Sequence, residues 1–463
     1  MARVTTQRLN QLEVACLLIA TPFLLFPSVL SVAALLILLA PWLLRWRARG
    51  RPTVRTPMDI PILCMLLMVP VAVWSSALPQ ESLRKLLGII LGVAFFYGVA
   101  NTGQTRGWIW CWTLVLVSIG VGISCLSLFG TDWASYKMLP LQPIYQRLPR
   151  LFHNVTTYGG GGFHPNEVGG ALALLVPVSL SACLALRSRN PGSTATDILA
   201  LGADRWEGST KRWVRPLLSR RTMLLLAALA FALTAGVFIL TQSRSAYVGM
   251  AVGLIAFGVS RSRWFLVALL VVAVMASVLV WSVGVEGVID SFLPVESGRI
   301  AVGRLEIWRR AAYLMQDFPY TGVGLNMFPY VGDAMYPYPS QGLSARVPHA
   351  HNNFLQVAVD LGIPGLIAYL ALLVAFCACA WRIYRHSQSR PLRLLTAGLF
   401  SGMLAHQVYG LTDAITLGAK PGFVLWIILG MVAAVYHLEV DQRGPLITAK
   451  TEKTSRLVPS SHA

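Results

Sequence analysis

Charged residues are scarce in this chain of 463 residues. Only 12% of the residues are charged, and the 19 acidic residues are outnumbered two to one by 38 basic ones. Soluble globular domains carry about 25% charged residues, so this composition excludes an ordinary soluble protein. With 56% hydrophobic residues and a mean hydropathy of +0.63, the chain instead has the composition of a polytopic membrane protein.

Several sequence features of metal and nucleotide sites are also missing. Four consecutive glycines at positions 159 to 162 suggest a phosphate-binding loop, but the Lys-Ser/Thr pair of a P-loop does not follow them. There is no Asp-x-Asp motif and no zinc-like Cys/His cluster, so we expect neither a required metal nor a cofactor. The cysteines form no disulfide framework, because all seven fall within or at the ends of apolar stretches: Cys16, Cys64, Cys111, Cys125, Cys183, Cys377 and Cys379.

Long apolar stretches dominate the chain and predict an all-α integral membrane protein with about 12 transmembrane helices. Pro22 and Pro27 leave open whether the first two stretches are one kinked helix or two short ones. The stretches lie near residues 12 to 26, 28 to 44, 58 to 76, 83 to 100, 107 to 128, 167 to 186, 222 to 240, 245 to 259, 264 to 284, 353 to 381, 392 to 411 and 421 to 438.

The placement of the basic residues predicts the orientation. With both termini in the cytoplasm, most of the 38 basic residues fall in cytoplasmic segments, which is the positive-inside pattern. The predicted organisation is then as follows: 1–284, nine transmembrane helices with an outer loop at 129–166 and a cytoplasmic loop at 187–221; 285–352, a large outer loop; 353–440, three further transmembrane helices; and 441–463, a cytoplasmic tail.

A polar cluster stands where the stretch near 353 begins. The sequence from Pro348 to Gly365 reads PHAHNNFLQVAVDLGIPG, and it places His351 and Asn352 at the start of a hydrophobic run. A purely structural interpretation is available, because Asn is a good helix N-cap and an interfacial His is often solvated. His349, His153 and His164 are more typical of surface histidines.

The same stretch resembles the O-antigen ligase and polymerase superfamily of bacteria. His351-Asn352, nine residues and then Gly362-Ile-Pro-Gly365 reproduce the family pattern H-N/S/Q-x9-G-x-x-G, which favours the ligase branch. The resemblance implies a GT-C-like glycosyltransferase of the bacterial inner membrane. It also implies transfer of O-antigen from undecaprenyl pyrophosphate to the lipid A-core oligosaccharide, with the active site facing the periplasm.

Two arginines match the family's functional positions. Arg244 lies in the short turn Thr-Gln-Ser-Arg-Ser-Ala, and S-R-S-A resembles the turn that carries an essential arginine. A structural alternative is that Arg244 snorkels to lipid headgroups. Leu305, Trp308, Ala312 and Met315 recur at helical spacing and predict an amphipathic helix from about 302 to 318. Within it the family arginine matches Arg304, although Arg299 is close enough to compete, and Arg309 and Arg310 have an alternative as a solvated face.

Other residues are weaker candidates for substrate binding. Asn166 ends a G-x-F-x-x-P-N element that recurs in the superfamily and opens an apolar stretch. Tyr336 and Tyr338 are candidate glycan contacts, because aromatic faces are natural sugar platforms, but they are equally typical of membrane-interface anchors. Asn352 is the last of the residues predicted to bind substrate.

The resemblance implies a role for each main residue. Arg244 and Arg304 would bind the pyrophosphate. His351 would act as general base for the acceptor hydroxyl in a single inverting displacement, since imidazole has an ordinary pKa of about 6.5, or would instead hydrogen-bond the diphosphate. An O-antigen polymerase or a protein O-oligosaccharyltransferase would use the same residues. A 12-span flippase or transporter is the alternative from another class. It is disfavoured because we expect the spans to be almost free of charge and because the two halves are unrelated.

Overall fold

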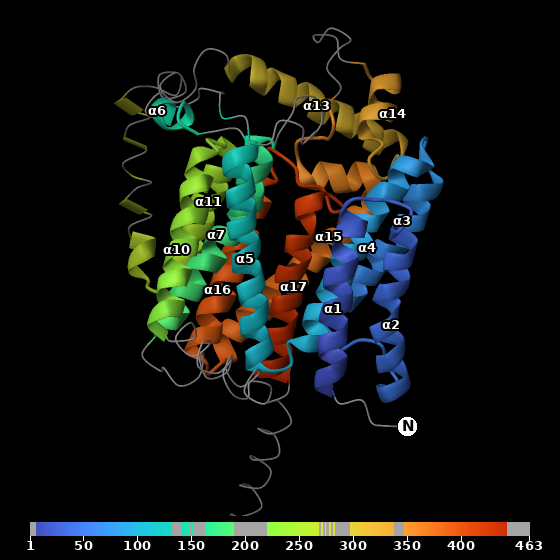
Figure 1. The fold of residues 1–463 in the computed structure, drawn as a ribbon. Helices are drawn as coiled ribbons and strands as arrows, with labels where there is room; N and C mark the ends of the chain where they lie inside the picture. Colours follow the sequence, from blue (N-terminus) through green and yellow to red (C-terminus); the bar gives the residue numbers. More distant parts are fainter. Residues whose placement is uncertain are drawn as a thin grey trace, which may run out of the picture.

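The computed structural model describes residues 6–131, 133, 141–148, 151, 163–188, 220–267, parts of 268–282, 297–337 and 347–441. These residues form a helical bundle and contain no strand, apart from an isolated bridge between Thr131 and Phe163 (Figure 1). The long helices of the bundle are α1 (Thr6–Leu25), α2 (Ser31–Arg49), α3 (Asp59–Trp74), α4 (Pro79–Thr102), α5 (Arg106–Gly130), α7 (Pro165–Arg187), α10 (Arg220–Leu240), α11 (Arg244–Val259), α15 (Asn353–His386), α16 (Arg390–Tyr409) and α17 (Phe423–Tyr436).

Among the described residues, eight helices are long and apolar enough to cross a membrane. Two more, α3 and α11, are apolar but contain only 16 residues each. The protein is therefore a multi-pass membrane protein. The count of twelve spans stays a prediction, since the stretch from 264 to 284 is only partly described.

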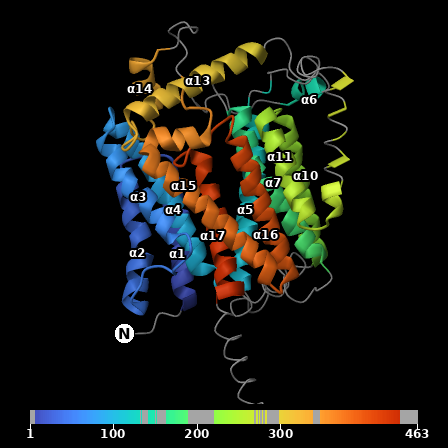
Figure 2. The ribbon, with the colours of Figure 1, turned by 180° about the vertical axis from the view of Figure 1, so that it is seen from behind.

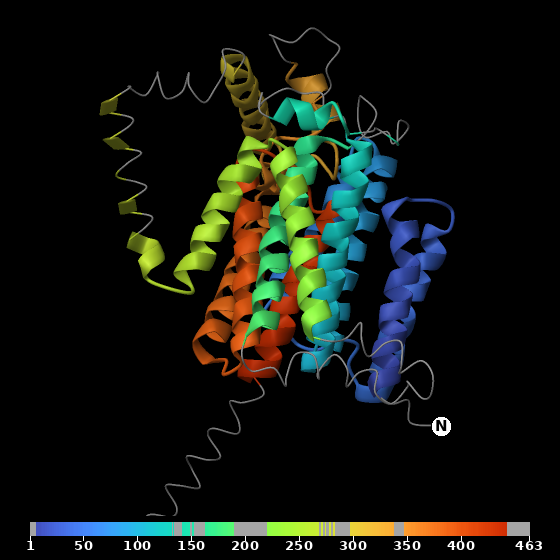
Figure 3. The same cartoon turned by 60° about the vertical axis from the view of Figure 1, so that its left-hand side comes forward.

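The first two apolar stretches are separate helices. α1 ends at Leu25 and α2 begins at Ser31, so the chain turns around Pro27, while Pro22 is accommodated inside α1. Figure 3 shows α1 and α2 as an antiparallel pair at one edge of the bundle. The question that the two prolines left open is thereby answered in favour of two helices.

A buried ion pair joins this pair of helices to α4. Arg45 on α2 contacts Glu13 on α1 at 2.5 Å, and the side chains are 2% and 1% exposed. Asn10, Trp42 and Asn101 complete the hydrogen bonds to the two charged groups. The expectation of spans almost free of charge therefore needs correction: buried charges occur, and here they are paired, as the cost of desolvating an isolated charge requires.

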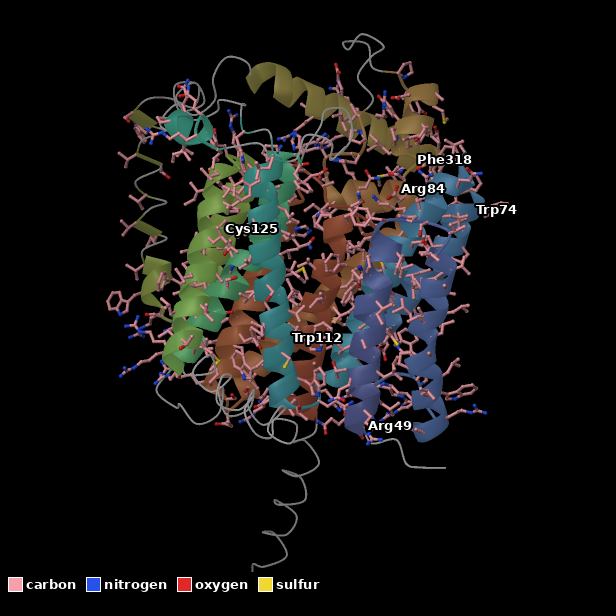
Figure 4. The ribbon with its side chains drawn as sticks, in the orientation of Figure 1. Arg49, Trp74, Arg84, Trp112, Cys125 and Phe318 are labelled. Carbon is pink, nitrogen blue, oxygen red and sulfur yellow. The ribbon has the colours of Figure 1, made fainter. Side chains whose placement is uncertain are left out.

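Two helices lie across one end of the bundle, which we call the α13 end (Figures 1 and 2). They are α13 (Ser297–Asp317), which confirms the amphipathic helix predicted near 302 to 318, and α14 (Phe328–Met335). Figure 4 shows Phe318 and Arg84 at this end and Arg49 at the opposite end.

An apolar layer and an ion pair hold α13 and α14 together. Ile307 and Leu314 of α13 pack with Phe328 of α14 in one buried cluster. Arg310 is 3% exposed and its Nη1 contacts Asp333 at 2.7 Å. The solvated-face alternative for Arg310 is therefore wrong, because the guanidinium is a buried part of the α13–α14 contact, whereas Arg309 is exposed.

A glycine bends α15 near its beginning. Gly362 has a φ of 72°, and a Cβ there would approach the carbonyl oxygen of Tyr320 to 2.5 Å. Glycine is the residue that adopts this conformation without strain, and the missing side chain lets the chain after α13 pass close by. Figure 2 shows the first part of α15 lying across the bundle and the remainder running along it. The nine residues between the His-Asn pair and Gly362 are thus one short helical segment.

Candidate functional site

His351 lies in the loop before α15, at the α13 end. Its backbone has a left-handed φ of 45°, which is unusual for a residue with a side chain. Two contacts hold this conformation: the His351 N–H donates to Nδ1 of His349 (3.2 Å), and the His351 carbonyl accepts from Trp308 Nε1 on α13 (3.4 Å). Strained backbone of this kind gathers at functional sites, where the surrounding structure must maintain it.

Asp413 is the partner of the His351 side chain. His351 Nδ1 and Asp413 Oδ1 are 3.2 Å apart, and Asp413 is 3% exposed, while the imidazole is half-buried. Burial would raise the pKa of Asp413, but the hydrogen bond from His351 and the nearby imidazoles outweigh it and lower that pKa. The carboxylate is therefore ionised and accepts the proton of Nδ1, which leaves the Nε2 lone pair available to take a proton.

The neighbouring asparagines lock the two loops of the site together. Asn352 caps α15 by accepting from the N–H groups of Phe354 (2.9 Å) and Leu355 (3.0 Å), as the capping interpretation predicted. Its side chain also donates to the Leu411 carbonyl (2.9 Å). The Asn353 N–H donates to the carbonyl of Gly410 at 2.7 Å. The role of Asn352 in substrate binding stays a prediction.

The turn that carries Arg244 adjoins the Asp413 loop. Thr412, next to Asp413, donates its hydroxyl proton to the hydroxyl of Ser245 at 2.9 Å. Arg244 itself is the first residue of α11 and has an exposed side chain. The structure thus brings the predicted Arg244 turn next to the His351–Asp413 pair, although the two segments are more than 160 positions apart in the chain.

Arg304 of α13 lies near the His351–Asp413 site. This side chain is half-buried, and its charge acts on Tyr409 at the end of α16. Tyr409 in turn interacts electrostatically with Asp413. Arg299 belongs to the first turn of α13, but its side chain lies outside the described residues. Of the two competing arginines, the described structure therefore connects Arg304 to the site.

Asn166 is the second residue of α7, which begins at Pro165, two residues before the apolar stretch in the sequence. The backbone N–H of Asn166 donates to Nδ1 of His164, so His164 acts as the helix cap. The next residue, Glu167, is close enough to Asp413 for an electrostatic interaction. This places the start of α7 beside the site, while a substrate contact by Asn166 stays a prediction.

Lys85 on α4 is a further cation near the histidines. Its charge acts on both Glu167 and His349. It also lines a cavity of about 20 Å³ beneath the loop, together with Gln356 and Asp360. A cavity of this size holds about one water molecule, so it is part of the support of the site rather than a glycan pocket.

The predicted tyrosines lie farther along the same end. Tyr336 follows α14, donates a hydrogen bond to Asp317 and packs against Tyr313 with 5.2 Å between ring centroids. Tyr338 lies outside the described residues. The described contacts of Tyr336 are with α13, and its role in glycan binding stays a prediction.

The sequence interpretation missed Lys85, Glu167 and Asp413. Each is an ionisable residue at or near the end of an apolar stretch, on the side where the motif residues were expected. A charged side chain at such a position costs free energy unless it is paired or has a function. That cost could have marked these three residues as site candidates. Asp413 is 62 residues from His351, so no local spacing rule connects the two residues.

The structure and site define a class: a multi-pass helical membrane protein with a polar, histidine-containing site at one end of its bundle. Residues 229–370 match the model of the family described as O-antigen ligase. This segment contains Arg244, Arg304, His351 and the Gly362 bend. Over this segment the chain is similar to the O-antigen ligase family.

Curated relatives with related names are similar to part of the chain. Three proteins named "Putative polysaccharide ligase" are similar to the chain: one of Rickettsia conorii (25% identical over 34% of this chain and 39% of the relative), one of Rickettsia prowazekii (26%, over 30% and 36%) and one of Rickettsia bellii (24%, over 30% and 35%). The alignments span little more than a third of each relative.

Proposed function

We propose that this protein is a glycosyltransferase that joins a lipid-linked polysaccharide to a glycolipid acceptor. In particular, it transfers O-antigen from undecaprenyl pyrophosphate to the lipid A-core oligosaccharide on the periplasmic face of the bacterial inner membrane. The observation that carries the proposal is the ionised, buried Asp413 holding His351 by Nδ1, with the Arg244 turn hydrogen-bonded to the same loop.

The reaction needs a base and cations, and this end of the protein offers both. His351 Nε2 takes the proton of the acceptor hydroxyl while that oxygen attacks the anomeric carbon of the donor sugar. The bond from this carbon to the diphosphate oxygen breaks in the same step, so the anomeric configuration inverts. Asp413 stabilises the imidazolium that forms.

Arginines are suited to the diphosphate. A guanidinium binds phosphate oxygens by two parallel hydrogen bonds and remains charged, so Arg244 and Arg304 hold the pyrophosphate and stabilise the charge that develops on it as it leaves. Lys85 adds a point charge from α4. Asn166, Arg299, Asn352, Tyr336 and Tyr338 are proposed contacts of the glycans. Neither a nucleotide nor a metal has a role in this scheme.

The test is a transfer reaction with purified protein. Lipid-linked O-antigen and lipid A-core are mixed without nucleotide and with a chelator, for wild type and His351→Ala. We expect lipopolysaccharide of raised mass with the wild type only. Elongated lipid-linked glycan in place of ligated product would identify a polymerase, and equal product from both proteins would leave His351 as a structural residue of the loop.

The transporter alternative has one supporting observation, since paired or cavity-lining charges such as Glu13–Arg45 and Lys85 do occur within the spans. Movement of lipid-linked glycan across vesicles, without any transferred product, would favour it over the ligase.

A further inference from the structure

We propose that His349, His351 and Asp413 form a site for a divalent transition-metal ion, Zn²⁺, whose binding inhibits the protein. One ligand atom from each of the three residues lies within 4.8 Å of the other two. Imidazole nitrogen and carboxylate oxygen are both ordinary zinc ligands, and imidazole favours Zn²⁺ over Mg²⁺ or Ca²⁺. This inference rests on the proposed function only for the consequence of binding.

The separations fit a zinc ion. Two ligand atoms at about 2.0–2.1 Å from one ion are about 3.3 Å apart at the tetrahedral angle. His351 Nδ1 and Asp413 Oδ1 are 3.2 Å apart, so the ion would replace the proton they share with little movement. The third ligand atom needs to move by about 1.5 Å at most, which is within reach of a small side-chain rotation.

A buried atom without a partner points independently to a ligand. Asp413 is 3% exposed, and its Oδ2 has no hydrogen bond. The hydroxyl of the neighbouring Tyr409 is also buried without a hydrogen bond of normal geometry. Tyr409 interacts with Asp413 without normal hydrogen-bond geometry, and an ion bound by both carboxylate oxygens would give Oδ2 a partner as well as Oδ1.

His349 is available as the third ligand. Its Nδ1 accepts from the His351 N–H, which leaves Nε2 to bind an ion, and the two imidazole centroids are 4.3 Å apart. Charges nearby act in both directions: Glu167 and Asp413 favour a cation, whereas Lys85 opposes it. The fourth coordination position is left to water.

Zinc binding would switch off the base. The ion takes the Nδ1 lone pair of His351, so the ring proton moves from Nδ1 to Nε2 by way of solvent. Nε2 then carries the ring proton and has no lone pair to accept another, and Asp413 is no longer free to stabilise an imidazolium. The protein is therefore active with a chelator and inhibited by free Zn²⁺.

Binding is tested first without any substrate. The full chain, purified in detergent with a histidine-free tag, is titrated with Co²⁺, whose tetrahedral complexes absorb strongly in visible light. We expect one equivalent of absorbing Co²⁺ in wild type and in His386→Ala, a matched exposed histidine at the end of α15 far from the site. The absorption should be lost in His349→Ala and displaced by Zn²⁺. No absorption in wild type, or equal absorption in His349→Ala, overturns the proposal.

A second variant guards against misfolding. His349→Asn keeps an acceptor for the His351 N–H but offers a poor metal ligand, so it should fold and still lose the Co²⁺ absorption. The consequence is then measured as the ratio of transfer rates with and without Zn²⁺. We expect at least a tenfold loss in wild type, reversed by chelator, and a ratio near one in His349→Asn. Equal inhibition of both proteins overturns the site, whereas transfer that fails even with chelator refutes the proposed function and leaves the Co²⁺ result standing.

Discussion

Replacement of Asp413 by asparagine separates orientation of the base from binding of substrate. Asp413 Oδ1 accepts from His351 Nδ1 at 3.2 Å and from the Ala414 N–H at 2.9 Å. Asparagine has nearly the same shape, and its oxygen can keep the Ala414 contact. Its NH₂ group would then face Nδ1 as a donor and move the imidazole proton to Nε2, the atom that must accept the acceptor's proton.

The expected loss follows from the size of general-base catalysis. A correctly placed base contributes about 10²–10⁴ in rate, so the turnover of Asp413→Asn should fall at least about 100-fold, or about 2.7 kcal/mol in the barrier. The KM values should change by less than about threefold, because Asp413 is buried and contacts His351 and the Ala414 N–H rather than solvent.

The assay is the transfer reaction with chelator, with donor and acceptor varied separately. Asp59→Asn is the matched control, since it makes the same chemical change at the start of α3, where the carboxylate contacts Thr56. Turnover of Asp413→Asn within threefold of wild type would refute the dyad. A raised KM with unchanged turnover would move Asp413 into substrate binding.

Three further outcomes follow from the contacts described. Gly362→Ala places a side chain at a φ of 72° against the Tyr320 carbonyl and should lower stability by about 1–3 kcal/mol in a thermal melt, while Gly122→Ala, with open space around it, should not. Glu13→Leu leaves Arg45 buried and unpaired, so it should destabilise by about 3–5 kcal/mol and more than the same change combined with Arg45→Leu; equal melting temperatures would contradict this. Arg244→Ala should lower transfer by about 100-fold or more, whereas exposed Arg309→Ala should leave it within twofold.

The sequence predicted those parts of the fold that depend on local patterns. Apolar stretches predicted the helices, and the helical spacing of Leu305, Trp308 and Met315 predicted α13. The buried face of α13 is nevertheless a different one: it carries Ile307, Ala311 and Leu314, whereas Leu305 is exposed. The motif contained Gly362, but the sequence did not show why a glycine is needed there. A positive φ there is required by the approach of Tyr320, which is a tertiary contact.

The site was only half predictable for a related reason. The resemblance supplied Arg244, Arg304 and His351, yet it gave no reason for His351 to be held in place. That reason is Asp413, in a short loop after a different helix, and no periodicity relates the two. The buried Arg310 was misjudged likewise, since helical spacing shows which face a residue occupies but not that α14 will cover that face.

Hydrogen bonds between loops explain how distant segments act as one site. The Arg244 turn meets the Asp413 loop through Ser245 and Thr412, and that loop meets the start of α15 through Gly410 and Asn353. These two contacts fix the Arg244 turn, the Asp413 loop and the start of α15 relative to one another, and with them the proposed cation for the diphosphate and the proposed base. The proposed in-line displacement requires such alignment, because an error of about 1 Å between base and leaving group costs roughly 100-fold in rate. The packed helices of the bundle are rigid, and the short turns at its α13 end therefore hold the site residues in fixed relative positions.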